Sequence, residues 1–325
     1  MMKIPFCSAG RAALRGEGFY ADASGIAFKS MRGFVMAVVS VSAPVRCVGA
    51  GHIRRWLPVR PRNAHKGDFG KLLLLCGAVG FTGAPALAAM GALRTGAGLV
   101  YLGVPETVYP IVAAKLDEPV VFPLPAQDGM LAEAAVPEIL RRLERCDACL
   151  IGCGLGQSAG TREVVQAVLA HANCPVVLDA DGINVLQGHI DILRGAACPV
   201  ILTPHDGEFA RLAGKPVGKN RIQAARELSL QTGATVLLKG HRTVIYGADG
   251  CYVNRTGNPG MATGGSGDVL AGVLASLLGQ GLPPVHAAAA AAYLHGAAGD
   301  RCASRLGEFG MLPSDLLQEL PRRLK

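Results

Sequence analysis

The sequence feature that most constrains the fold is an alternation of short apolar runs and longer helical stretches, which begins at about residue 66. Each apolar run ends in a glycine-rich or proline-rich turn. Several runs are continuously apolar, as expected for strands that are covered on both faces. Repeated βα units of this kind build a parallel sheet. The pattern therefore predicts an α/β fold with a mainly parallel central sheet.

The predicted strands are Leu72–Cys76, Leu99–Val104, Ala148–Gly152, Val176–Asp179, Val200–Thr203, Thr235–Lys239 and Thr243–Tyr246. The predicted helices are Ala84–Thr95, Ala132–Glu144, Thr161–Ala170, Glu208–Ala213, Arg221–Thr232, Asp268–Leu278 and Val285–Arg301. No internal repeat or long linker follows residue 66. We therefore predict a single domain over residues 52–325.

Residues 1–51 differ from the rest of the chain in charge. The formal net charge is +8, and much of the excess lies in the first 71 residues. We interpret residues 1–51 as a basic N-terminal extension that is poorly ordered, or as the product of a misassigned start, with Met31 or Met36 as the true one. The alternative is a short secretory signal around Phe34–Val41.

Composition excludes several classes of protein. A basic balance can indicate nucleic acid or an anionic membrane as partner, but the sequence has no RNP motif, zinc finger or basic stretch interleaved with aromatic residues. The apolar runs at 34–41 and 287–292 are too short to span a bilayer. The ten cysteines lack the dense, regular spacing of a disulfide scaffold, which favours free thiols in a reducing compartment. We expect a cytoplasmic enzyme that binds neither nucleic acid nor membrane.

Cys146, Cys149 and Cys153 form a C-x2-C-x3-C run that can be typical of a metal or cluster site. The run coincides with a predicted buried strand that leads into a glycine turn, and no fourth ligand is nearby in the sequence. We therefore predict no metal site made of protein ligands.

The stretch most informative about chemistry is Asn258-Pro259-Gly260-Met261-Ala262-Thr263-Gly264-Gly265-Ser266-Gly267-Asp268, which an apolar helical run follows at once. Glycines before a helix leave backbone N–H groups uncovered, and the helix dipole adds partial positive charge there, so the bend suits an anion. Asp268 could merely cap this helix. The functional alternative is that the bend holds a transferring phosphate while Asp268 accepts a proton. Neither a Walker A loop nor a dinucleotide-binding glycine fingerprint is present.

Three further clusters follow predicted strands. The segment 237–245 contains a basic turn, which by position alone is more often just solvated. His205, in the segment 201–209, lies where open α/β sheets bind ligands, although a structural role for this histidine is also open. The glycines of Gly152-Cys153-Gly154-Leu155-Gly156 would let a ligand approach the backbone, which is a weak signal alone.

Together these stretches resemble the ADP- or ATP-dependent NAD(P)H-hydrate dehydratase family, which has a ribokinase-like fold and forms the carboxy-terminal half of bifunctional nicotinamide-nucleotide repair proteins. The resemblance runs from about His65 to the end of the chain. It rests on His65-Lys66-Gly67-Asp68-Phe69-Gly70, Thr82-Gly83-Ala84-Pro85-Ala86, Leu93-Arg94-Thr95-Gly96-Ala97-Gly98-Leu99, Ile151-Gly152-Cys153-Gly154-Leu155-Gly156, Leu178-Asp179-Ala180-Asp181, Thr203-Pro204-His205-x-Gly207-Glu208, Lys239-Gly240-x-x-Thr243 and Gly264-Gly265-Ser266-Gly267-Asp268-Val269-Leu270. It implies a three-layer αβα sandwich.

The resemblance also assigns residues to roles. It implies that Asp268 is the catalytic base and that the residues contacting the hydrated cofactor are Ala84, Gly154, His205 and Asp268. It implies that the residues binding the adenine nucleotide are Lys239, Gly240, His241, Arg242, Thr243 and Gly267. The sequence departs from the family at Cys153, where Pro is common, and this change in a turn removes no reacting group.

The implied reaction is the dehydration of the S-epimer of hydrated NADH or NADPH at the expense of ADP or ATP. In it the ring hydroxyl is phosphorylated and phosphate is then eliminated. The resemblance further implies Mg²⁺ held mostly by phosphates and water, ADP as the donor that stand-alone chains use, a separate NAD(P)H-hydrate epimerase acting on the same substrate, and a homotetramer. Two alternatives stay open: a ribokinase-like kinase acting on a vitamin precursor, and a nucleotide sensor without activity.

Overall fold

The computed structural model describes residues 19–21, 27–31, 34–38 and 44–323, and the chain divides into two compact units, Met1–Pro44 and Val45–Lys325. The described part of the first unit is an antiparallel sheet of β1 (Phe19–Ala21), β2 (Ala27–Met31) and β3 (Phe34–Val38). Most of the predicted N-terminal extension lies outside the described residues, so its order stays a prediction.

The second unit begins at Val45, earlier than the predicted boundary at residue 52. The reason is that β4 (Val45–Cys47) pairs with a strand near the other end of the chain and α1 (Ala50–Trp56) follows it. The Trp56 ring stacks on His286, with ring centroids 4.4 Å apart, and meets the edge of Tyr252 at 5.5 Å. These contacts attach the segment to the domain.

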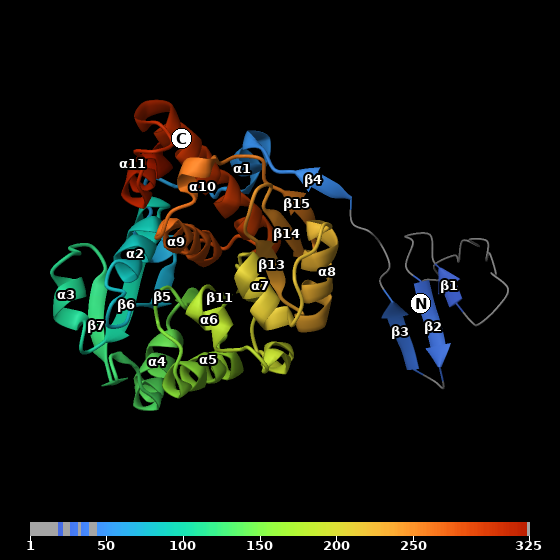
Figure 1. The fold of residues 1–325 in the computed structure, drawn as a ribbon, viewed down its shortest axis with the longest axis horizontal. Coiled ribbons are helices and arrows are strands. Elements are labelled where there is room, and N and C mark those ends of the chain that lie inside the picture. Colours follow the sequence, from blue (N-terminus) through green and yellow to red (C-terminus); the bar gives the residue numbers. More distant parts are fainter. Residues whose placement is uncertain (1–18, 22–26, 32–33, 39–43, 324–325) are drawn as a thin grey trace, which may run out of the picture. The chain divides into compact units, whose positions relative to one another are not determined.

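A ten-stranded sheet forms the middle of this unit (Figure 1), in the order β4-β15-β14-β13-β12-β11-β10-β5-β6-β7. All of its pairs are parallel except the two that involve β14. The remaining strands of the sheet are β5 (Lys71–Leu75), β6 (Leu99–Pro105), β7 (Val120–Leu124), β10 (Ala148–Ile151), β11 (Val176–Leu178), β12 (Val200–Leu202), β13 (Thr235–Leu238), β14 (Val244–Gly247) and β15 (Gly250–Val253). A separate small hairpin joins β8 (Ala126–Gln127) and β9 (Met130–Leu131).

Helices cover both faces of the sheet (Figure 1). One layer contains α1, α2 (Ala84–Arg94), α3 (Tyr109–Ala113), α9 (Ser266–Gly279), α10 (Pro284–Leu306) and α11 (Pro313–Arg323). The other contains α4 (Val136–Leu143), α5 (Ala159–His171), α6 (Asp181–Asn184), α7 (Asp206–Ala213) and α8 (Arg221–Thr232). Short 3-10 turns are η1 (Lys66–Phe69), η2 (Glu133–Ala135), η3 (Ile190–Gly195) and η4 (Pro259–Met261).

The two layers have separate hydrophobic cores because side chains alternate along each strand. In β5, Leu72 and Leu74 belong to the core under α2, α9 and α10, whereas Leu73 and Leu75 belong to the core under α5 and α8. All four side chains are fully buried. The predicted three-layer αβα sandwich with a mainly parallel sheet is therefore confirmed.

Every predicted strand and helix is present, with ends that differ by a few residues, except that Ala132–Glu144 divides into η2 and α4. The strands and helices that we did not predict are short or lie at the sheet edges, except for the eleven-residue helix α11. The Ala287–Ala292 run is buried inside α10, and none of the helices within the described ranges is long and apolar enough to cross a membrane.

Two glycines bring α2 and α9 into unusually close contact. A Cβ atom added to Gly272 of α9 would lie 2.0 Å from the carbonyl oxygen of Ala88, and one added to Gly91 of α2 would lie 2.6 Å from that of Val269. The two helices therefore pack backbone against backbone. Their N-terminal ends lead toward the site described next.

Candidate functional site

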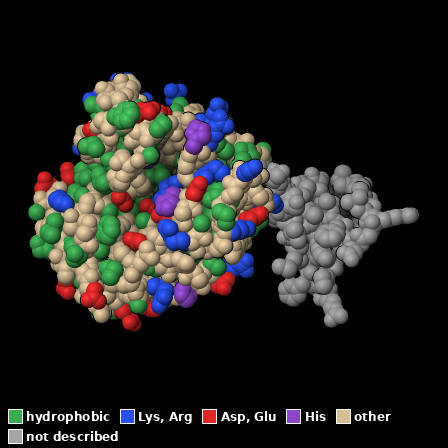
Figure 2. Space-filling model, viewed as in Figure 1, with side chains coloured by type: hydrophobic (Ala, Val, Ile, Leu, Met, Phe, Trp, Pro, Cys, Tyr) green, Lys and Arg blue, Asp and Glu red, His purple; other side chains and the backbone are tan. Residues whose placement is uncertain are grey.

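The predicted functional residues converge where the central strands end. Turns after β10, β11, β12 and β13 meet the N-terminus of α9 at the carboxyl edge of the sheet. Figure 2 shows acidic, basic and histidine side chains gathered near the middle of the described face. This is the edge at which open α/β sheets bind ligands.

Asp268 stands in the first turn of α9, which begins at Ser266 after Gly265. Gly265 adopts a left-handed conformation with φ of 97° and starts the helix without a side-chain cap or a capping box. The capping role considered for Asp268 is therefore not supported. The first N–H groups of a helix have no partner within it. A bare Gly267 follows Ser266, with Lys239 Nζ 3.6 Å and Asp179 Oδ2 3.9 Å from where a Cβ would stand.

Asp179 and Lys239 form a buried ion pair beside Asp268. Lys239 Nζ donates to Asp179 Oδ1 at 2.7 Å and lies 3.5 Å from Glu208 Oε2. Thr203 Oγ1 donates to the same oxygen of Asp179 at 2.7 Å. The Asp179 and Glu208 side chains are only 3% and 5% exposed. A buried charge of this kind is stable only when it is paired, so the cluster fixes the lysine ammonium close to the start of α9.

The surroundings of Asp268 make its carboxyl group less acidic than usual. Burial and the negative charge of Asp179 raise its pKa to about 6, although a hydrogen bond from Cys153 and the charge of Lys239 act in the opposite direction. A pKa near the pH of the cell suits a group that takes up a proton and releases it again. The surroundings of Asp268 are therefore compatible with the predicted role of a base.

Lys239 stays charged in spite of its burial. Burial alone would lower its pKa, but the carboxylates of Asp179 and Glu208 outweigh this effect and raise the pKa above its ordinary value. The site consequently holds a permanent ammonium ion next to Gly267. Such a fixed cation stabilises negative charge that develops on a neighbouring group.

His205 begins α7 and partly serves the helix itself. Its Nδ1 accepts hydrogen bonds from the N–H groups of Gly207 at 3.0 Å and Glu208 at 3.4 Å. Glu208 in turn accepts from the His205 backbone at 2.9 Å. The side chain is 52% exposed, so the ring both caps α7 and stays open to a ligand.

Ala84 and Gly154 lie next to each other, close to Cys153. The Cβ of Ala84 is 3.0 Å from where a Cβ of Gly154 would stand, and Phe81 packs against the same position. Gly154 follows Cys153, whose Sγ belongs to one cluster with the carboxylates of Asp179 and Asp268. The structure thus places Ala84 and Gly154 in contact with each other, with Gly154 one residue from the Cys153 that lies beside Asp268.

The remaining predicted nucleotide contacts form the turn of the β13–β14 hairpin. Thr243 Oγ1 donates to the Gly240 carbonyl at 3.0 Å and accepts from the Gly240 N–H at 3.3 Å, which closes the turn. Gly240, His241 and Arg242 are exposed. Of the predicted set, only Lys239 and Gly267 lie directly beside Asp179, and the rest of the turn extends outward.

Our prediction missed the roles of Asp179, Glu208 and Thr203, although all three lie in segments that we singled out. Asp179 directly follows the buried strand β11, and Thr203 follows β12. The signal was present, because the strand-end argument applied to His205 holds for them equally. What the sequence could not supply was that β11, β12 and β13 are neighbours in the sheet.

The cysteine run does not converge on one point. Cys146 precedes β10, Cys149 lies within it and Cys153 follows it, so the first and last members are at opposite ends of the strand. Among the described residues, Cys153, Asp179 and Asp268 form the one group of possible ligands, with their atoms within 4.8 Å of one another. A hydrogen bond with Cys76 and burial raise the pKa of Cys153 well above its usual value, which favours the neutral thiol over the thiolate that metal ions bind.

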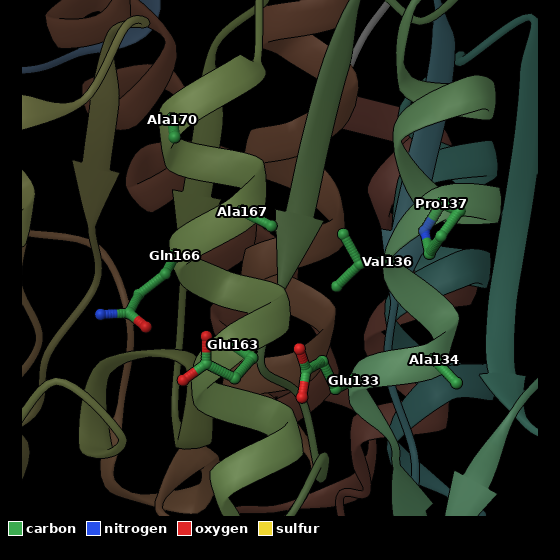
Figure 3. Close-up of a pocket in the computed structure, with 8 residues that line it drawn as sticks. All are labelled: Glu133, Ala134, Val136, Pro137, Glu163, Gln166, Ala167 and Ala170. Atoms are coloured by element: carbon green, nitrogen blue, oxygen red, sulfur yellow. The ribbon is translucent and has the colours of Figure 1, made fainter.

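A groove of about 760 Å³ runs between η2, α4 and α5 (Figure 3), away from these residues. Glu133 and Glu163 stand at one end of it and alanines line much of its length. It contains none of the predicted site residues. The groove is large, but it lacks the combination of carboxylates, lysine and histidine found at the strand ends. We therefore take the strand ends as the candidate site.

The fold defines a ribokinase-like α/β protein, in which a glycine-rich helix start carries the half-buried carboxylate of Asp268. A family model described as NAD(P)H-hydrate dehydratase matches residues 72–322. The chain is 43% identical over 305 residues to the bifunctional NAD(P)H-hydrate repair enzyme Nnr of Moorella thermoacetica, which covers 89% of this chain and 58% of that protein. It is 41% identical over 249 residues to the ADP-dependent (S)-NAD(P)H-hydrate dehydratase of Neisseria meningitidis, covering 74% of this chain and 80% of that protein.

A crystal structure of the Bacillus subtilis ADP/ATP-dependent NAD(P)H-hydrate dehydratase, co-crystallised with ATP/Mg²⁺, superposes with a TM-score of 0.73 at 34% identity and covers 86% of this chain and 97% of that one. The chain belongs to the NAD(P)H-hydrate dehydratase family, as the motifs of its sequence predict. It spans about half the length of the bifunctional relatives that it matches, between 50% and 58% in four of them.

Proposed function

We propose that this chain catalyses the ADP- or ATP-dependent dehydration of the S-epimer of hydrated NADH or NADPH, which restores the reduced cofactor. The observation that carries the proposal is the placement of Asp268. Its carboxylate, with a pKa of about 6, stands in the first turn of α9 next to Gly267 and the ammonium of Lys239. A base, an anion cradle and a fixed cation close together are what phosphoryl transfer to a hydroxyl requires.

In the first step the ring hydroxyl of the hydrated nicotinamide attacks the terminal phosphorus of the nucleotide. Asp268 takes the hydroxyl proton, and the bond between that phosphorus and the bridging oxygen breaks. AMP leaves when ADP is the donor, and ADP leaves when ATP is the donor. The N–H groups at the start of α9 and Lys239 would hold the negative charge of the group in transfer.

In the second step the ring nitrogen pushes out the new phosphate ester. Phosphate is a far better leaving group than hydroxide, so the carbon–oxygen bond breaks readily, and loss of a proton from the adjacent ring carbon restores the double bond. The products are the reduced cofactor, inorganic phosphate, and AMP or ADP. Ala84 and Gly154, which lie next to each other, and His205, at the start of α7, would hold the ring and its substituents.

The charge of the site supports a requirement for Mg²⁺. The carboxylates of Asp179, Glu208 and Asp268 stand near one ammonium, that of Lys239, before any nucleotide phosphate enters. Carboxylate oxygens suit this ion, whereas the Cys153 thiol does not. Asp179 and Asp268 would hold Mg²⁺ through its water shell, and the nucleotide phosphates would bind it directly. Bound there, the ion offsets phosphate charge.

The test is incubation of the chain with hydrated NADH and either ADP or ATP, while the absorbance of reduced nicotinamide and the release of phosphate are followed together. Both signals rise in parallel under this proposal. A small-molecule kinase of the same fold would instead accumulate a stable phosphorylated product, and a nucleotide sensor would bind ADP without consuming it. Comparison of the two nucleotides also identifies the donor.

The proposal also covers the partner enzyme, the cellular location and the oligomeric state. The bifunctional relatives carry repair activity in chains about twice as long, which supports a separate epimerase that acts on the same substrate. Cytoplasmic location and a homotetrameric state complete the proposal. Sedimentation of the purified chain tests the latter.

A further inference from the structure

Arg221 connects two of the segments assigned to ligand binding. It is the first residue of α8, and its Nη1 donates to both carboxylate oxygens of Asp206, at 2.7 and 2.9 Å. Its Nη2 donates to the carbonyl oxygen of Lys239 at 2.6 Å. Asp206 follows His205 at the start of α7, while Lys239 opens the β13–β14 turn. One guanidinium therefore joins the proposed substrate side to the proposed nucleotide side.

The β13–β14 turn that Arg221 contacts contains a strained backbone conformation. Arg242 has a φ of 56°, a left-handed conformation that non-glycine residues adopt at a cost of roughly 1–3 kcal/mol. The guanidinium lies against the bare Gly240, where an added Cβ would be 2.7 Å from Nη2. Its hydrogen bonds to the Lys239 carbonyl and to α7 stabilise the turn from outside.

Lys239 is fastened from the inner side as well. Its N–H donates to the Pro204 carbonyl at 2.8 Å, and its ammonium contacts Asp179 and Glu208. Beyond Lys239 the turn continues with the exposed residues Gly240 to Arg242. The Thr243 hydroxyl forms hydrogen bonds with Gly240 within the turn, and Arg221 donates to the Lys239 carbonyl from α8. Of these two contacts, only that of Arg221 ties the turn to another element.

We propose that Arg221 is a positioning residue for the nucleotide: it preorganises the Lys239–Thr243 turn by clamping it to Asp206 at the start of α7. The inference rests on the proposed function, which makes this turn a nucleotide site. A planar fork that reaches a carboxylate and a carbonyl at once is a property of arginine, and the single ammonium of lysine cannot reproduce it. Preorganisation of a loop contributes to affinity because binding need not order it.

The test is calorimetric titration of ADP into the full chain and into Arg221→Lys, with Arg141→Lys as the matched control. Arg141 also forms a bidentate pair with a carboxylate, that of Glu138 at 2.7 and 2.8 Å, but within α4. We expect the dissociation constant for ADP, and the KM for ADP in the dehydration assay, to rise roughly tenfold in Arg221→Lys. The kcat at saturating ADP and the midpoint of thermal unfolding stay close to those of the control.

A second variant, Asp206→Asn, removes one end of the clamp and keeps Arg221 in place. It is expected to weaken ADP binding by a smaller factor in the same direction. Unchanged ADP affinity in Arg221→Lys overturns the inference, and so does a fall in kcat and thermal stability without a change in affinity. If the unaltered chain binds ADP but regenerates no reduced cofactor, the proposed function fails while the comparison of ADP affinities still decides the role of Arg221.

Discussion

The carboxylate of Asp268 owes its chemistry to residues that are far apart in the sequence. Asp179 comes from the end of β11, Lys239 from the end of β13 and Cys153 from the end of β10. Each changes the affinity of Asp268 for a proton by an amount that depends on distance and burial. The function of this one residue is therefore a property of the sheet that brings its neighbours together.

Replacement of Asp268 by Asn removes the proton acceptor and keeps the size of the side chain. We expect turnover to fall by roughly 10²-fold or more, in the range that a positioned base contributes. The affinity for ADP, measured by calorimetry, stays within a few-fold of the original because the N–H groups of α9 and Lys239 remain. Full turnover in Asp268→Asn would remove this residue from the role of base.

The pH dependence of turnover follows from the pKa of about 6 that burial and Asp179 give Asp268. Only the ionised form accepts a proton, so kcat/KM is expected to fall tenfold per pH unit below about pH 6 and to be independent of this group well above it. Because kcat/KM reports the groups of the unliganded enzyme, a kcat/KM profile between about pH 4.5 and 8 checks this. An acid limb centred near the ordinary aspartate value, about 4, would contradict the assigned environment.

At the scale of elements, local signals predicted the central βα units and failed at the borders of the sheet. A strand such as β5, with four fully buried leucines, is identifiable from its own residues. β7 includes Pro123 and two exposed or half-buried valines, and β4 has three exposed residues. Such edge strands exist because a neighbour supplies hydrogen bonds. The sequence does not record which neighbour that is.

The starts of helices were also predicted less accurately than their central parts. The α5 helix begins at Ala159, before the predicted start at Thr161, because Ser158 caps it: the Ser158 hydroxyl accepts from the Thr161 N–H at 3.0 Å. Ser158→Ala is expected to lower the free energy of unfolding by about 1 kcal/mol while turnover stays unchanged. Ser158→Asp, which can still cap, should lose little. Denaturant unfolding of the three proteins checks the order, and equal loss in both variants would exclude the cap as the cause.

At the scale of the whole molecule, the β4 and α1 segment determines where the domain begins. Deletion of residues 1–44 is expected to leave thermal unfolding and ADP binding unchanged, since Val45–Lys325 is a compact unit. Deletion of residues 1–57 also removes the buried Ile53 and the Trp56 ring on His286. Loss of two such side chains should lower the unfolding midpoint by roughly 10 °C. Equal midpoints for both deletions would show that the domain starts later.

The site was predictable to the extent that it follows from motifs. The bend before Asp268 and the turn after β13 indicated an anion cradle and a basic loop, and both are at the carboxyl edge of the sheet. The clamp by Arg221 and the Asp179–Lys239 pair were not predictable, because they depend on the order β11-β12-β13 and on α7 and α8 meeting there. Contacts between elements depend on the complete fold and cannot be read from any one segment of the sequence.

The backbone contact between α2 and α9 limits how the site can move. With Gly272 against Ala88 and Gly91 against Val269, neither helix can slide or roll without a steric collision. The helix ends that carry Ala84 and Asp268 therefore keep a constant separation when a ligand binds. With the β13–β14 turn fastened to the start of α7 by Arg221 on the other side, a ligand meets a site whose two sides are both set before it binds.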